Sequence, residues 1–185
     1  MVTDARDRMV RTAALLLAKR GLQGASFSEV LTASGAPRGS IYHHFPEGKD
    51  QLVTEALALA QARALAALEE HRDRPATEIA QAFVQLWRDV LVASDHQAGC
   101  AVVAVTVATE DRALIETAAA VFRDWQDTLA DLLRTGGVSA DRAASLAALL
   151  IAASEGAVIV ARAQGSLQRF DAVADELIGA VASAS

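Results

Sequence analysis

The sequence predicts an all-α fold, and its composition and its hydrophobic periodicity carry that prediction. Alanine occupies 42 of the 185 positions, aromatic residues make up only 4%, and proline occurs three times. Alanine loses no side-chain entropy in a helix and is depleted in strands. Apolar residues also recur at helical spacing along the chain, in about nine separate segments. Sandwiches, barrels and doubly wound sheets are therefore excluded.

Two helices are predicted before residue 36. Residues 3–20 place their apolar side chains on one helical face, and Gly21 ends that segment. Ser26 then lies three residues before Glu29, which is the spacing of a capping box. The short helix that begins there stops near Gly35.

A third short helix follows almost at once and completes a known motif. Pro37 has the backbone angle that suits a first helical position, and Ile41 and Phe45 lie four residues apart on one face. Two short helices joined by a glycine-containing turn of about three residues form a helix-turn-helix. The sequence therefore predicts a three-helix head.

Longer helices are predicted after the head. Pro46 ends the third helix, and residues 49–72 keep one apolar stripe over roughly 35 Å, which makes them a connector. Further helices are predicted after Pro75 and over residues 99–109, 111–135, 139–164 and 167–181. Residues 99–109 are rich in strand-forming Val and Thr, but a solitary strand would lack a ladder partner, so we expect a helix there too.

Charge divides the chain as the helices do. Residues 1–50 hold seven Lys/Arg and five Asp/Glu, a net charge of +2, whereas residues 51–185 hold ten and eighteen, a net charge of −8. We therefore predict two domains: a mildly basic head, residues 1–48, and an acidic body, residues 49–185. A small DNA-reading module on a sensing or assembly body has this distribution.

No targeting or membrane signal appears in the chain. The N-terminus has no basic flank followed by an apolar run, and the single Cys100 cannot form an intramolecular disulfide. The longest apolar candidate lies between Arg142 and Glu155, which is shorter than the roughly 18–20 residues of a span. We expect a cytoplasmic protein without a membrane partner.

The residues around the third helix are the candidate DNA contacts. In a helix-turn-helix the second helix enters the major groove. Arg38, Ser40 and His43 can then meet base edges or phosphates, while Gly39 allows close backbone approach. Tyr42 and Lys49 can contact phosphates from the flanks. The alternative is a helical hairpin on which these residues form a solvated polar face.

Residues 24–52 closely resemble the DNA-binding signature of the TetR family of bacterial transcriptional regulators. The resemblance lies in the Gly35 turn, in residues 40–45 (SIYHHF) and in Lys49. Most members have one residue fewer between the Phe-Pro pair and the lysine. That difference, with residues 36–40 and the Gly99-Cys100 pair, is similar to the LmrA/YxaF-like branch.

The resemblance implies a three-helix head, a connector and about five further helices, the last two of which pair with a second subunit. It also implies that the matching residues touch DNA: Ser26, Arg38, Gly39, Ser40, Tyr42, His43 and Lys49. Ser26 is expected to cap its helix and meet a phosphate. The dimer contacts expected on the last two helices are Leu149, Ala153, Val160, Phe170, Leu177 and Ile178.

A ligand pocket is predicted in the body, on six residues. These are Phe83, Trp87, Cys100, Phe122, Trp125 and Glu155. The four aromatic residues either line an apolar pocket or pack as ordinary core. Glu155, inside a very apolar helix, is either paired, solvent-facing on the dimer side, or a polar contact for a ligand. Cys100 is either a small buried apolar group or a ligand or redox contact.

Catalytic and metal-binding sets are missing from the sequence. His96 and Cys100 lie four apart, but no third ligand is near, and no phosphate-binding loop, zincin motif or nucleophile elbow occurs. We therefore predict a non-enzymatic protein without a cofactor. It is expected to be a homodimeric repressor that a small apolar or aromatic ligand releases from a palindromic operator. The alternatives are a DNA-binding regulator without an inducer and a helical small-molecule-binding protein that does not read DNA.

Overall fold

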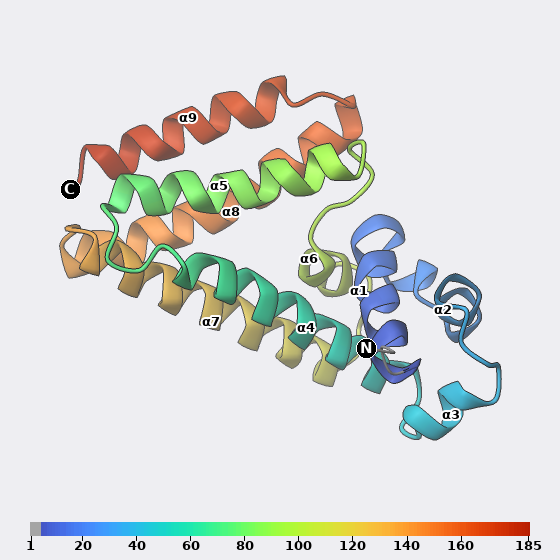
Figure 1. The fold of residues 1–185 in the computed structure, drawn as a ribbon. Coiled ribbons are helices and arrows are strands. Elements are labelled where there is room, and N and C mark those ends of the chain that lie inside the picture. Colours follow the sequence, from blue (N-terminus) through green and yellow to red (C-terminus); the bar gives the residue numbers. More distant parts are fainter. Residues whose placement is uncertain (1–4) are drawn as a thin grey trace. The chain divides into compact units, whose positions relative to one another are not determined.

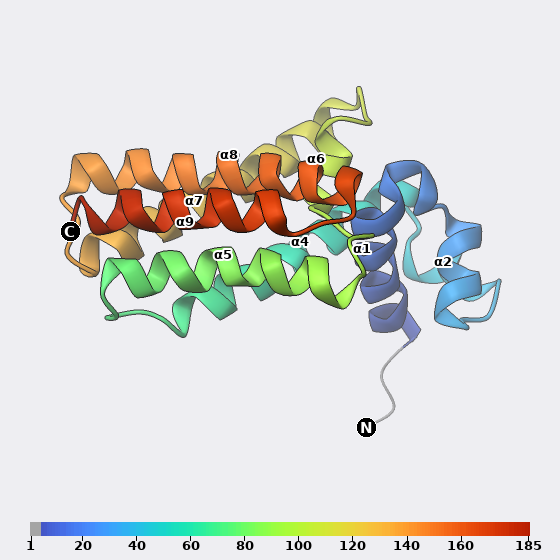
Figure 2. The same cartoon turned by 90° about the horizontal axis from the view of Figure 1, so that it is seen from above.

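Residues 5–185 are described by a computed structural model, and they form nine α-helices and no strand (Figures 1 and 2). The helices are α1 (Ala5–Gly24), α2 (Phe27–Ser34), α3 (Ser40–His44), α4 (Lys49–Glu69), α5 (Ala76–Ala93), α6 (Ala101–Thr106), α7 (Arg112–Thr135), α8 (Ala140–Gln164) and α9 (Gln168–Ala182). The all-α prediction is confirmed, including the helix in the Val-rich segment. The start expected at residue 3 lies outside the described residues.

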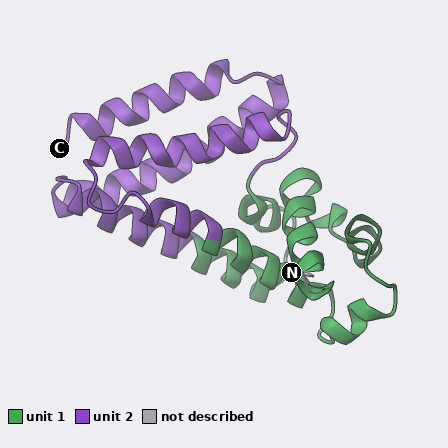
Figure 3. Cartoon of the chain, in the orientation of Figure 1, with its two compact units in different colours: residues 1–62, 100–121 green, residues 63–99, 122–185 purple. Residues whose placement is uncertain are grey.

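The chain divides into two compact units (Figure 3). The first unit comprises residues 1–62 and 100–121, and the second comprises residues 63–99 and 122–185. Helices α4 and α7 each contribute residues to both units. The first unit thus contains the predicted head together with most of α4, all of α6 and the start of α7. The domain boundary expected after residue 48 stays a prediction.

Helix α1 is the centre of the first unit and contacts α2, α3 and α6. Met9, Ala13 and Leu17 follow one another at four-residue spacing on its inner face, and each is 0% exposed. Gly21 has φ 71° and ψ −174°, so the regular helix is interrupted where the sequence predicts its end. A side chain would be strained in that backbone conformation.

The ends of α2 match the sequence prediction. The Oγ of Ser26 accepts a hydrogen bond from the backbone N–H of Glu29 at 3.3 Å, as expected for a capping box. Gly35 ends the helix in the left-handed conformation, with φ 66°, and donates its N–H to the carbonyl of Leu31.

Helix α3 begins three residues later than predicted, so the assignment of Pro37 to the first helical position is wrong. The carbonyl of Pro37 accepts hydrogen bonds from the backbone N–H of Ser40 at 3.0 Å and from its Oγ at 2.7 Å. Residues 37–40 therefore form a turn. The fixed φ of proline suits a turn as well as the start of a helix, and the hydrogen bond from the Ser40 hydroxyl to the Pro37 carbonyl favours the turn. Ile41 and Phe45 face the core as expected, each 0% exposed.

In the second unit α5, α8 and α9 lie side by side and contact one another (Figure 2). Phe83, Leu150 and Phe170 contribute large buried side chains from the three helices. Among residues 5–185, α8 is the one helix long and apolar enough to cross a membrane, and half of that stretch is buried inside the chain. A core helix passes the same test of length and composition.

The turn before α5 lies against the turn after α7, within the second unit. The N–H of Ala76 donates to the carbonyl of Gly136 at 3.0 Å. Arg72 binds Glu69 at 2.6 Å and Asp131 at 2.9 Å. Its hydrogen bonds lower the pKa of both carboxyl groups, and Arg134 lowers that of Asp131 further.

Gly136→Ala is expected to destabilise the protein. An added Cβ would lie 2.6 Å from the Ala76 nitrogen and 2.8 Å from the Arg74 oxygen, and these backbone atoms cannot move as a flexible side chain can. We expect a loss of about 1–3 kcal/mol in the free energy of unfolding in urea. The control is Gly179→Ala in α9, where the added Cβ meets nothing within 4 Å. That change should raise stability by up to about 1 kcal/mol. Equal stability of the two variants would contradict the close approach at Gly136.

Candidate nucleic-acid interface

Helices α2 and α3 form the helix-turn-helix predicted from the sequence, and α1 supports both. Val30 of α2, Ile41 of α3 and Phe45 after it are each 0% exposed. Since these three side chains occupy the inner side of the motif, the other faces of α3 are directed outward. In a helix-turn-helix that outward surface is the one that enters the major groove.

Three of the predicted contact side chains project from this surface. Arg38 in the turn before α3 and His43 within α3 are exposed, and 69% of Tyr42 is exposed. The ring of His43 contacts that of His44 edge-on, with centroids 5.4 Å apart. A base edge or a phosphate can reach all three side chains without any rearrangement of the core.

Gly39 leaves the backbone in front of α3 uncovered. Its φ of −72° and ψ of −18° are accessible to any residue, and an added Cβ would meet nothing within 4 Å. The fold therefore does not need glycine at this position. The missing side chain matters only to a molecule that approaches from outside.

Tyr42 is held by a residue that the sequence analysis did not assign to the site. The ring of Phe27 meets the ring of Tyr42 edge to face, with centroids 5.6 Å apart and planes at 78°. Phe27 is the first residue of α2 and directly follows Ser26, so the start of α2 lies beside Tyr42. No local pattern could have revealed this contact, because the two aromatic residues belong to different helices.

The other predicted contacts make hydrogen bonds within the chain. The hydroxyl of Ser26 accepts from Glu29, and the hydroxyl of Ser40 donates to Pro37. The Nζ of Lys49 donates to the carbonyl of Leu22 at 2.8 Å. This bond ties the first residue of α4 to the C-terminal part of α1, so Lys49 has a structural role whether or not it meets DNA.

The structure brings only part of the predicted ligand set together. Phe122 and Trp125 on α7 contact each other edge to face at 5.8 Å, while Phe83 and Trp87 lie one turn apart on α5. Cys100 belongs to the first compact unit, where it caps α6 through a 3.4 Å bond from the N–H of Val103 to its Sγ.

Glu155 is 8% exposed, so the solvent-facing alternative for that residue is wrong.

Among the described residues no cluster of three or more His, Cys, Asp or Glu side chains is placed to hold a metal ion.

The predicted dimer residues divide into outward-facing and buried ones. Leu149 is 46% exposed and Val160 is 41% exposed, and Ala153 and Ile178 are half-buried. Phe170 and Leu177 are only 1% and 5% exposed and pack inside their own chain. The exposed apolar residues of this group therefore lie on α8.

Two family profiles match the chain. Residues 10–56 match the profile of bacterial regulatory proteins of the tetR family. Residues 75–176 match the C-terminal domain of LmrA/YxaF-like transcriptional regulators. The first match includes the whole helix-turn-helix, and the second includes α5 to α8 and the first part of α9.

Relatives and solved structures agree with these matches. An uncharacterized HTH-type transcriptional regulator of Mycobacterium tuberculosis is 38% identical in an alignment of 179 positions that covers 93% of this chain and 91% of the relative. The HTH-type transcriptional regulator LmrA of Bacillus subtilis is 28% identical in an alignment of 162 positions that covers 85% of this chain and 86% of the relative.

A TetR transcriptional regulator from Legionella pneumophila has the same fold, with a TM-score of 0.82 at 22% identity over 95% of this chain and 96% of its own. A regulatory protein TetR from Rhodobacter sphaeroides also scores 0.82, at 21% identity over 95% of this chain and 98% of its own. With a helix-turn-helix whose outward face carries Arg38, Tyr42 and His43, and with a body of the LmrA/YxaF-like type, this chain belongs to the TetR family of bacterial transcriptional regulators, which are non-enzymatic DNA-binding proteins.

Proposed function

We propose that the protein is a homodimeric repressor that a small ligand releases from a palindromic operator in the cytoplasm. The observation that carries the proposal is the outward-facing group on and before α3, formed by Arg38, Tyr42 and His43. With α3 in the major groove, Arg38 and His43 reach base edges, and Arg38 suits the O6 and N7 acceptors of guanine. Tyr42 donates its hydroxyl proton to a phosphate.

The internally bonded residues keep a defined capacity for DNA. Ser26 uses its hydroxyl oxygen as an acceptor, which leaves its O–H to donate to a phosphate. Ser40 uses its O–H as a donor, so its free lone pairs suit an amino group on a base edge. Lys49 donates one of its three N–H groups to the carbonyl of Leu22, and the other two can donate to a phosphate. Gly39 has no side chain, so the backbone there can approach the DNA closely.

Tyr42→Phe should weaken binding to all DNA sequences alike, by roughly 10- to 150-fold, because one hydrogen bond to a charged phosphate is lost. Arg38→Ala should instead relax the preference at one base position of each half-site. Selection of duplexes from a random pool, at low and moderate salt, measures both effects. A changed sequence preference in Tyr42→Phe would contradict the phosphate assignment. Failure of the unaltered protein to enrich any sequence would favour the binding protein that does not read DNA.

An apolar stripe on α8 supports the dimer. Leu149, Ile159 and Val160 are 46%, 54% and 41% exposed, and Gly156 between them leaves open space. Gly156 lies seven residues after Leu149 and three and four residues before Ile159 and Val160, and these spacings bring the four residues toward one side of the helix. A second copy of the same face would bury this stripe in an isologous contact. The twofold axis would then place two α3 helices on half-sites about one helical turn, or a multiple of it, apart.

Val160→Glu should give monomers that have lost operator binding, because a carboxylate would be placed in the apolar contact between subunits. Val92→Glu is the matched control, since Val92 is also exposed, at 55%, but lies on α5. The control should stay dimeric and bind DNA. Analytical ultracentrifugation and operator titration measure the two properties. A Val160→Glu protein that is dimeric and fully competent for DNA would remove α8 from the interface.

Buried polar atoms in the second unit support a ligand site. The Nε1 of Trp125 and the Oγ of Ser154 are buried and have no hydrogen-bond partner among residues 5–185. Leaving a buried donor unsatisfied costs about 1–3 kcal/mol. A ligand with apolar or aromatic surface and one acceptor would satisfy the indole N–H. The alternative, a regulator without an inducer, rests on the burial of Phe83 and Trp125, each 6% exposed, as in an ordinary core.

Release of DNA requires a ligand that prefers one conformer of the protein. Helix α4 runs without interruption from Lys49 at the end of the helix-turn-helix to Glu69 in the second unit. A ligand that favours a conformer with shifted α4 changes the separation of the two α3 helices. By reciprocity, bound DNA lowers the affinity for the ligand by the same factor as the ligand lowers the affinity for DNA. The coupling free energy between two such sites is typically about 1–3 kcal/mol.

Trp125→Phe should keep operator affinity but raise, by about tenfold, the concentration of inducer that releases the operator, because the indole donor is lost. A panel of planar aromatic compounds, scored for operator release and for a shift in tryptophan emission, supplies the inducers. Trp87→Phe serves as a control for the emission change. Release from Trp125→Phe at an unchanged concentration would place the ligand elsewhere. A panel in which nothing releases DNA would favour the regulator without an inducer.

A further inference from the structure

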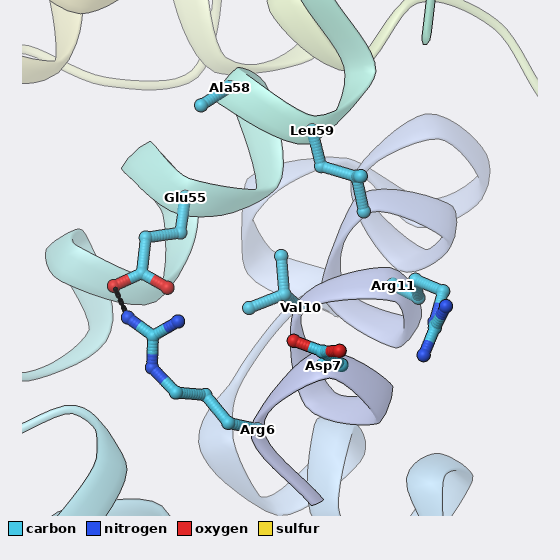
Figure 4. A pocket seen from close by; sticks show the side chains of 7 residues that line it. All are labelled: Arg6, Asp7, Val10, Arg11, Glu55, Ala58 and Leu59. Atoms are coloured by element: carbon cyan, nitrogen blue, oxygen red, sulfur yellow. Dashed lines mark hydrogen bonds and ion pairs between the residues drawn. The ribbon is translucent and has the colours of Figure 1, made fainter. Parts of the chain in front are cut away.

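Arg6 connects three helical segments of the first unit. Its Nη2 donates to the Oε1 of Glu55 on α4 at 2.7 Å (Figure 4). Its guanidinium carbon also lies 5.6 Å from the centre of the Phe45 ring, directly after α3. Because Arg6 belongs to the first turn of α1, one side chain contacts α4 and the end of α3 at the same time.

Glu55 extends this connection to the turn between α3 and α4. The same Oε1 atom accepts a second hydrogen bond, from Nε2 of Gln51 at 3.2 Å. The Oε1 of Gln51 in turn accepts from the backbone N–H of Glu47 at 3.2 Å. The turn is therefore held twice: Arg6 covers the side chain of Phe45, and Gln51 binds the backbone of Glu47.

These polar contacts lie beside a pocket in the first unit. Figure 4 shows the pocket, of about 490 Å³, between α1 and α4. It is lined by Arg6, Asp7, Val10, Arg11, Glu55, Ala58 and Leu59. The ion pair of Arg6 and Glu55 therefore lies at the wall of a pocket on the surface of the first unit.

The charge of Glu55 is unfavourable for DNA binding by itself. A carboxylate in the unit that meets a polyanion repels phosphates. An ion pair whose side chains are 42% and 23% exposed also contributes little to stability by itself. A favourable effect of the pair on DNA binding would therefore act through the orientation of α3, whose end Arg6 contacts at Phe45.

We propose that Arg6 and Glu55 are positioning residues for DNA recognition, which set the orientation of α3 relative to α4. They act through Phe45 and Glu47 and do not contact bases themselves. The inference depends on DNA binding alone and needs neither the dimer nor the inducer.

Glu55→Gln is the decisive variant, because electrostatics and positioning predict opposite results. Removal of a negative charge should strengthen DNA binding if charge alone matters. We expect instead that affinity for the duplex selected by the unaltered protein falls about two- to fivefold, since the bond to Arg6 loses its charge. Asp7→Asn is the matched control: it makes the same charge change in the same pocket, and it should bind as tightly as the unaltered protein or more tightly.

The Arg6 variants separate positioning from direct phosphate contact. Arg6→Lys keeps the charge but loses the planar group over Phe45, so its affinity should fall while the salt dependence stays unchanged. If Arg6 bound a phosphate, Arg6→Ala would lower the slope of log affinity against log salt by about 0.9, and Glu55→Gln would have no adverse effect. The loss of affinity caused by Glu55→Gln should be smaller in the Arg6→Ala background than in the unaltered protein.

Circular dichroism and thermal unfolding establish that each variant is folded at the temperature of the titrations. Should Glu55→Gln not fold, the affinity and salt slope of Arg6→Lys decide the question. The proposal is overturned if Glu55→Gln binds as tightly as Asp7→Asn, or if the losses in the double variant simply multiply. Because Asp7→Asn tests the same duplex, a general failure of DNA binding is distinguished from a failure of positioning.

Discussion

The proposed DNA-binding surface depends on the burial of Ile41 and Phe45. Helix α3 is only five residues long, and a helix of that length is not stable through its own hydrogen bonds. Both anchors are 0% exposed, so the core of the first unit supplies the stability that α3 lacks. Arg38, Tyr42 and His43 can face outward in defined positions only because the opposite side of the motif is fixed.

Hydrogen bonds at both ends of α3 extend this constraint. Before α3, the hydroxyl of Ser40 donates to the carbonyl of Pro37 and closes the turn. After α3, the side chain of Gln51 accepts from the backbone N–H of Glu47, and the ammonium group of Lys49 donates to the carbonyl of Leu22. Polar residues of this motif therefore serve the fold and the proposed contact with DNA together. Substitution of such a residue changes the position of α3 as well as the contact of the substituted side chain with DNA. Tyr42 is exposed, so the loss of its hydroxyl group tests the contact with DNA alone.

Much of the fold and part of the candidate site were predictable, because the deciding interactions are local. The N-cap hydrogen bond of Ser26 and the left-handed Gly35 depend on neighbours in sequence, and the structure confirms them. Residues 99–109 were predicted as helical by excluding a lone strand, and α6 confirms a helix in the middle of this range, over Ala101–Thr106. Pro37 was misplaced, since a proline suits a turn or a helix start equally and the hydroxyl bond of Ser40 favours the turn.

The sequence by itself determined the helical elements, the helix-turn-helix and the family, since periodicity, caps and a contiguous motif are properties of neighbouring residues. Only the tertiary structure decided which of the predicted residues face outward. It placed Phe170 and Leu177 in the core of their own chain and left Leu149 and Val160 exposed. It also paired Arg6 with Glu55, 49 positions apart. Such contacts depend on how helices pack, and a single sequence contains no periodic signal for them.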